Sequence, residues 1–348
     1  MQIDKIVYFA ILLRKCVEER VPRPDSTVTR LFLAALHSYM EKHELEGGYH
    51  QNERSAAYLL TMSKELEIIY RNNKPTPWGT ALAFFVQDVI PKELSTEFKI
   101  IFAKYFLLED FAFIRSLTDH IEQYKVLGDD YSWYRETTAL PKGGYANTAF
   151  SVYIHALKIA YESSESIALQ RRYLSLYRQA GKKGKTAKAL FPKMKPPLGM
   201  MEDIDLIKKR KSNNNTIQFA ENNGYVACID LMNQFRDYKT LAKTYYGNHD
   251  LISIILQAYG YQGKKTLDKS GIISILEALY TKLADPVFNV CDLDTLTDIL
   301  VVQNNIQGYR VTELEVRQVI DEASKKDRYK YQILPDRRGK YRFLKIKK

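Results

Sequence analysis

Cysteine is scarce in this chain, and the three cysteines that it has are far apart. Cys16, Cys228 and Cys291 form no CxxC pair and no even-numbered set from which a disulfide framework could be built. We therefore expect reduced thiols in a cytoplasmic protein, and not a small secreted domain held together by disulfides.

Long apolar runs are missing as well. The first 21 residues contain one such run, Ile6 to Leu13, and charged residues flank it on both sides. Eight residues are too few to cross a bilayer, which takes about 20, and no small-residue cleavage site follows the run. We expect a core helix there, no signal peptide and no membrane segment.

The motifs of the common enzyme classes are also lacking. Gly181 to Thr186 resembles a phosphate-binding loop, but the motif needs glycine where this chain has Gln179, and a strand must precede it. The six histidines are dispersed, and no cysteine lies near them. We expect no catalytic residue, no metal site and no cofactor, and favour a non-catalytic protein over an enzyme.

Two acidic clusters are candidate metal sites, because carboxylates can bind metal ions. Glu202, Asp203 and Asp205 leave a metal-dependent nuclease open as an alternative, although such a site needs carboxylates from several elements. The start of a short helix explains them more simply. Asp292, Asp294 and Asp298 resemble part of a calcium loop, but the central glycine and terminal glutamate are absent, so a helix cap is favoured.

The net charge of +11 is concentrated in two short segments. Residues 182–211 contain ten Lys/Arg and three Asp/Glu, and residues 325–348 contain eleven and two. The remainder of the chain is mildly acidic, with a net charge of −5. Such local basicity is typical of a surface that binds a polyanion, although a solvated lysine-rich surface would have the same composition.

The last 37 residues change their hydrophobic period once. Thr312 and Glu315 form a capping box, and Val316, Val319, Ile320 and Ala323 then repeat with helical spacing. After residue 328 the pattern alternates over 329–334, turns at 335–339 and alternates again over 340–346. A helix followed by a hairpin with a basic tip resembles the end of a winged helix, and this segment is similar to the winged helix-turn-helix superfamily.

A weaker resemblance to the same superfamily covers residues 26–90. A predicted helix and the short apolar run 66–70 precede a turn at 71–74, and Thr76 and Pro77 then provide the cap and first position of a new helix. This order is similar to a second winged helix with a short wing, and an all-helical subdomain with one loop fits equally well.

These patterns together predict a mainly α protein with small β wings, in which winged-helix modules flank a helical middle region. We expect an N-terminal helical domain in 1–92, which is a candidate winged helix, and a helical domain in 93–180. A basic linker in 181–215, a helical region in 216–284 and a C-terminal winged-helix domain in 285–348 complete the prediction.

Our functional hypothesis is non-catalytic binding of double-stranded DNA through its phosphates, within a larger system for regulation, replication or defence. The expected contacts come from the C-terminal module and the linker: Arg317, Lys325, Lys326, Arg328, Arg337, Arg338, Lys340, Arg342, Lys182, Lys183, Lys185, Lys208, Lys209 and Arg210.

The acidic first turns of the helix that follows Thr312 favour a second hypothesis, a protein-binding role. Glu313, Glu315, Asp321 and Glu322 would repel phosphates if this helix entered a DNA groove. Terminal winged helices joined through a linker also resemble kleisin-type subunits, which bridge the heads of chromosome-organising ATPases and bind protein. The sequence leaves the oligomeric state open.

Overall fold

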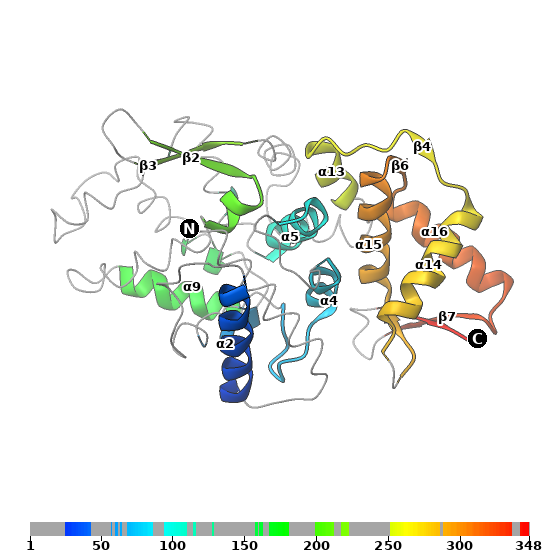
Figure 1. Ribbon diagram of the computed structural model, residues 1–348, viewed down its shortest axis with the longest axis horizontal. Helices are drawn as coiled ribbons and strands as arrows, with labels where there is room; N and C mark the ends of the chain where they lie inside the picture. Colours follow the sequence, from blue (N-terminus) through cyan, green and yellow to red (C-terminus); the bar gives the residue numbers. More distant parts are fainter. Residues whose placement is uncertain are drawn as a thin grey trace. The chain divides into compact units, whose positions relative to one another are not determined.

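The computed structural model of the 348-residue chain describes part of its length. The described residues are 25–42, 57, 60–61, 63–64, 68–85, 94–109, 114–115, 127–128, 157–158, 160–162, 167–180, 199–211, 217–222, 251–285, 288–335 and 342–347. They are mainly helical with a few small strands, as the sequence predicted (Figure 1). The chain divides into two compact units, a first of residues 1–7, 92–94 and 102–247 and a second of residues 8–91, 95–101 and 248–348.

The N-terminal part of the second unit contains helix α2 (Asp25–Lys42) and helix α4 (Pro77–Phe84). Between them the chain reverses at residues 70–74, where Tyr70 N–H donates to the Lys74 carbonyl over 2.8 Å, and Ile69 pairs with Pro75 in an isolated β-bridge. Thr76 caps α4 by accepting the Gly79 N–H over 3.1 Å. The predicted turn and helix start are therefore confirmed, because both depend only on neighbouring residues.

Gly79 explains how this turn can pack closely against α4. A Cβ at Gly79 would lie 2.2 Å from the Ile68 carbonyl oxygen, closer than two such atoms can approach. The Thr76 hydroxyl also donates to the Ile68 carbonyl over 3.0 Å. Ile68, which precedes the chain reversal, is thus held against the first helical turn of α4.

Helix α5 (Thr96–Glu109) lies in the predicted helical domain of residues 93–180, where the spacing of Phe98, Ile101 and Phe102 predicts one apolar face. The predicted face, which includes Phe98, Ile101 and Phe102, is buried as expected. The opposite side is buried too, and even Lys104 is fully inaccessible. A helix buried on all sides carries no sharp amphipathic pattern, which is why the sequence did not indicate this arrangement.

The first unit contains helix α9 (Ile167–Ala180) and a three-stranded antiparallel sheet. Strand β3 (Ile217–Glu221) lies between β1 (Leu127–Gly128) and β2 (Ile207–Lys211). The prediction of a linker is wrong for 207–211, and that of a helix is wrong for 217–221. Five residue pairs join β2 to β3, and this pairing between separate segments overrides the lysine-rich composition.

The C-terminal part of the second unit is a bundle of helices with a hairpin. Its elements are α13 (Leu251–Ala258), β4 (Lys265–Thr266), α14 (Lys269–Leu283), β5 (Cys291–Asp292), α15 (Leu293–Ile306), β6 (Tyr309–Arg310), α16 (Glu313–Lys326), β7 (Tyr331–Pro335) and β8 (Arg342–Ile346). Strands β4 and β6 pair in parallel, and β5, β8 and β7 form an antiparallel sheet in that order. We call α14, β5, α15, α16, β7 and β8 the C-terminal module.

Helix α15 is the centre of this bundle and packs against α4, α13, α14 and α16 (Figure 1). Eleven of its 14 residues are buried. Two of its buried polar side chains bond to backbone one turn earlier, as buried polar groups generally do: Asn304 donates to the Leu300 carbonyl over 2.7 Å, and Asn305 to the Val301 carbonyl over 2.9 Å. Helix α4 and the C-terminal module therefore share one core.

Candidate nucleic-acid interface

Helix α16 begins as the sequence predicted. The Glu315 N–H donates to the Thr312 hydroxyl over 3.2 Å, and the Thr312 N–H donates to the Glu315 carboxylate over 2.8 Å, which completes the capping box. Val316, Val319 and Ile320 are buried against the bundle. The predicted inner face of the helix is confirmed.

The first turn of α16 is occupied by contacts within the protein. Glu313 is 1% exposed, and its carboxylate accepts the Ile252 N–H over 2.9 Å. Ile252 lies in the first turn of α13, whose backbone N–H groups need partners outside the helix. Glu313 therefore caps α13 and is not one of the carboxylates that would face a phosphate.

Arg317 was predicted to contact DNA, and its position argues against that role. Its side chain is 10% exposed and forms an ion pair with Asp294 on α15. The pair joins the two helices inside the module. We therefore remove Arg317 from the candidate interface, because a guanidinium held by a carboxylate below the surface cannot also reach a base edge.

The acidic residues near Arg317 begin α15, which is the helix-cap role that the sequence favoured. Asp292 is its N-cap and accepts the Thr295 N–H over 2.8 Å. Burial, followed by the charges of Asp294 and Asp298, raises the pKa of Asp292 to about 7. Within the described part of the chain, no three His, Cys, Asp or Glu side chains are grouped closely enough to hold a metal ion.

The charge on the exposed face of α16 changes from negative to positive along the helix. Its first three turns expose Glu315, Asp321 and Glu322, and Glu322 pairs with Lys269 over 2.7 Å. Its last turn exposes Lys325 and Lys326. Any polyanion would therefore approach the C-terminal end of this helix and not its beginning.

The cations continue from the end of α16 onto the hairpin. Lys325, Lys326, Arg328 and Arg342 are exposed, and none has an ion-pair partner among the residues that the structure describes. We call these four residues the basic row. Arg342 lies opposite Pro335, and four residue steps separate it from the last residue of β8. At about 3.4 Å per residue, Arg342 lies about 14 Å along the strand from that residue.

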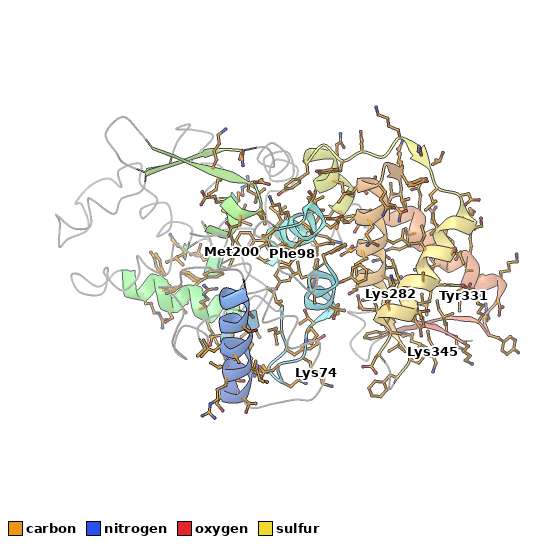
Figure 2. All side chains as sticks on the ribbon, viewed as in Figure 1. Lys74, Phe98, Met200, Lys282, Tyr331 and Lys345 are labelled. Carbon is orange, nitrogen blue, oxygen red and sulfur yellow. The ribbon has the colours of Figure 1, made fainter. Side chains whose placement is uncertain are left out.

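Lys330 follows this row but is bound internally. It pairs with Glu277 on α14 over 2.7 Å, and this hydrogen bond is the main reason that the pKa of Lys330 rises to about 12. The same contact lowers the pKa of Glu277. Figure 2 shows the neighbouring residues Tyr331 and Lys345 on the two strands of the hairpin. Lys330 thus fixes the base of the hairpin to α14.

The remaining predicted contacts divide into two groups. Arg337, Arg338, Lys340, Lys182, Lys183 and Lys185 lie outside the described residues. Lys208, Lys209 and Arg210 lie in β2 of the first unit, where Lys208 is half-buried. Glu202 and Asp203 close a helical turn before that strand, and both are half-buried.

Sequence reasoning missed three residues beside the basic row: Tyr329, Lys282 and Lys347. Tyr329 was predicted only as part of an alternating strand, and no role was predicted for Lys282. Their exposure could not be read from the local pattern, because it depends on how α14 and the hairpin pack.

Comparisons of the chain with protein-family models, with curated proteins and with solved structures found no match. No helix among the described segments is both long and apolar enough to cross a membrane.

Proposed function

We propose that the C-terminal module is a winged helix that binds double-stranded DNA through its phosphates. The order of its elements supports this proposal: α14, β5, α15 and α16 are followed by the β7–β8 hairpin, and β5 pairs with the last strand. In this assignment α16 occupies the place of the recognition helix and the hairpin is the wing.

The observation that carries the proposal is the basic row. Four exposed cations without ion-pair partners in the described segments lie at the end of α16 and along the hairpin. Cations at the end of a compact module neutralise phosphates and release counterions, which gives an affinity that falls steeply with salt. The acidic start of α16 then implies weak preference for base sequence, because base edges are read from that end.

The test measures DNA affinity by fluorescence anisotropy of a labelled 30-base-pair duplex at several salt concentrations. In the test variant, Lys325, Lys326 and Arg328 are each replaced by glutamine. Losing three phosphate contacts should reduce the slope of log affinity against log salt by about 2.7. A second variant replaces Arg337, Arg338 and Lys340, three of the four cations expected at the wing, and should reduce the slope by a similar amount.

The matched control replaces Lys264, Lys265 and Arg310 by glutamine. These residues are also exposed, and they lie at the β4–β6 end of the same unit. The change in net charge equals that of the test variant, so only the position of the charges differs. An equal reduction of the salt slope in both variants would show that the basic row has no special role. An unchanged salt slope in the test variant would exclude the basic row as a DNA-binding surface.

One observation favours a protein partner as the second candidate function. The outer face of α16 exposes Leu314, which is 44% accessible, next to the acidic Glu315 and Asp321. An exposed leucine among carboxylates suits a basic, partly apolar protein surface better than DNA. Affinity purification that recovers a large ATPase from wild type, but not from a Leu314→Asp variant, would support this scaffold role.

A further inference from the structure

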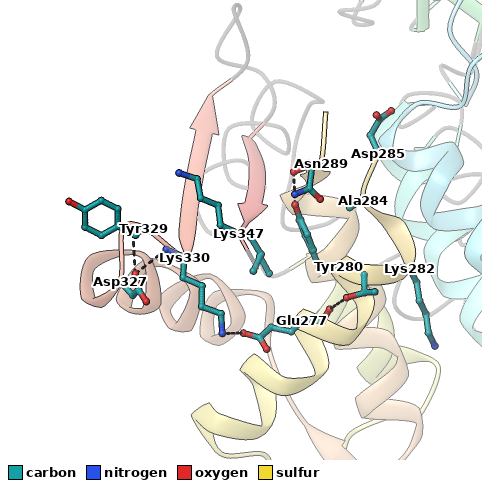
Figure 3. A pocket seen from close by; sticks show the side chains of 12 residues that line it. Glu277, Tyr280, Lys282, Ala284, Asp285, Asn289, Asp327, Tyr329, Lys330 and Lys347 are labelled. Carbon is teal, nitrogen blue, oxygen red and sulfur yellow. Dashed lines mark hydrogen bonds and ion pairs between the residues drawn. The ribbon is translucent and has the colours of Figure 1, made fainter. Parts of the chain in front are cut away.

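A cleft of about 870 Å³ opens beside the basic row (Figure 3). It lies between the C-terminal half of α14, the segment that follows α14, the turn after α16 and the end of β8. The residues that matter here are Glu277, Lys282, Asp285, Asp327, Tyr329, Lys330 and Lys347. A space of this size is sufficient for a drug-sized ligand.

Tyr329 is the aromatic residue that distinguishes this cleft. Its side chain is 85% exposed, so the ring contributes little to the core. The Asp327 carboxylate accepts the N–H groups of Tyr329 and Lys330 over 3.1 and 2.9 Å, which fixes the turn that carries the ring. Figure 3 shows Tyr329 and Lys282 at opposite edges of the cleft, with the Tyr329 ring directed outward. The backbone turn that carries the ring is thus fixed, and the ring itself stays accessible.

The acidic residues of the cleft already have partners. Glu277 accepts hydrogen bonds from Lys330 and from the Tyr331 hydroxyl. Asp285 accepts the Phe288 N–H over 2.9 Å, and Asp327 holds the turn described above. Lys282 and Lys347, in contrast, are exposed and have no ion-pair partner among the described residues. The cleft therefore has an aromatic platform and two available cations, and its three lysines are balanced by its three carboxylates.

The balance of positive and negative charges determines what kind of ligand fits the cleft. Because its charges balance, the cleft attracts an isolated phosphate less strongly than the neighbouring basic row does, where cations are in excess. An uncharged flat ring suits the cleft, since every nucleobase has a face that can stack on an aromatic side chain. The two lysines can contact the sugar-phosphate chain on either side of such a base.

We propose that this cleft binds an unpaired nucleobase stacked on Tyr329, at a single-stranded end next to the duplex on the basic row. The inference extends the proposed function and depends on it. The protein then prefers duplex DNA that carries a short single-stranded overhang to the same duplex with blunt ends.

The experiment compares the full-length protein on two labelled duplexes that differ only in a four-nucleotide overhang. Stacking of one base on an aromatic side chain is worth about fivefold in affinity or more. The wild type should therefore bind the overhang duplex at least about fivefold more tightly. Tyr329→Ala should lose that preference and Tyr329→Phe should keep it, because phenylalanine keeps the stacking face. A 2-aminopurine in the overhang should be quenched by wild type and by the phenylalanine variant only.

Phe288→Ala is the matched control. Phe288 is an exposed aromatic residue of the same module, 69% accessible, and it does not line this cleft. Its removal should leave the overhang preference intact. Circular dichroism should show that Tyr329→Ala folds, as expected for a ring that is 85% exposed.

Three results would overturn the inference, and they separate it from the proposed function. Equal affinity of the wild type for both duplexes, with a steep salt slope, would remove the base site and leave duplex binding standing. An equal loss of affinity for both duplexes in Tyr329→Ala would show that the ring contacts duplex DNA and not an unpaired base. Absence of binding to either duplex would remove both proposals together.

Discussion

The ion pair between Arg317 and Asp294 provides the sharpest prediction, because it separates a structural arginine from a DNA contact. We expect Arg317→Met to destabilise the second unit, since methionine keeps most of the side-chain volume and removes the charge. The Arg317 side chain is 10% exposed and that of Asp294 is 27% exposed. The variant therefore leaves a carboxylate that is mostly shielded from water and has lost this partner.

The magnitude follows from that exposure. Removing one partner from a fully buried ion pair costs about 3–5 kcal/mol. Water can still reach part of Asp294, so we expect a loss of about 2 kcal/mol in the free energy of unfolding. For a body of this size, that loss corresponds to a decrease in Tm of about 4–8 °C. Adding Asp294→Asn should restore part of the loss, because the unpaired charge is then removed.

The assay is thermal unfolding followed by circular dichroism, together with the salt dependence of DNA binding. Lys325→Met is the control, since it removes the same charge from an exposed position of the same helix. That change should alter stability by no more than about 0.5 kcal/mol. Our reasoning is refuted if Arg317→Met leaves Tm unchanged and reduces the salt slope by about one, the value for a lost phosphate contact.

Three further predictions concern the local features of the fold. The raised pKa of Asp292 means that the folded state binds a proton that the unfolded state releases, so stability should fall as pH rises from about 4 to 7. Asp292→Asn, which can still cap α15, should reduce the change in Tm between pH 5 and pH 8. An unchanged pH dependence of Tm in this variant would contradict the raised pKa of Asp292. Gly79→Ala should cost about 1–3 kcal/mol in chemical denaturation because its Cβ would meet the Ile68 backbone. Gly271→Ala, whose Cβ would meet mainly side-chain atoms, should cost less, and equal costs would refute the close-approach argument. Thr312→Ala should destabilise α16 by about 1 kcal/mol, which urea unfolding would detect, and Thr312→Ser should restore most of that loss.

The sequence predicted best the features that depend on residues close together in the chain. The capping box at Thr312 and Glu315, the turn at 71–74 and the helix that starts after Thr76 all form within a few residues. The hairpin was also recognisable, since its alternation reflects one buried face. These elements place the basic row, and its four exposed cations could therefore be named in advance.

Contacts between distant segments were not predictable in the same way. Arg317 has the residue type and helix position of a base contact, and only the packing of α15 shows that Asp294 binds it. Glu313 likewise acts on Ile252, 61 positions away. Strand β2 was hidden by its lysines, because its partner β3 supplies the pairing that composition cannot show. In each case a side chain or strand was assigned to solvent or ligand before its partner within the protein was known.

The lysines at the end of α16 have a structural explanation that must be weighed against DNA binding. Lys325 and Lys326 lie in the last turn, where positive charge stabilises a helix by about 0.3–1 kcal/mol per residue through the helix dipole. That effect ends within one turn, and Arg328 lies beyond the C-cap at Asp327. Arg342 lies on β8, beside Pro335 at the far end of the paired strands, where no helix end requires it. Helix stability therefore accounts for two members of the basic row and leaves two without a role, whereas an extended polyanion accounts for all four.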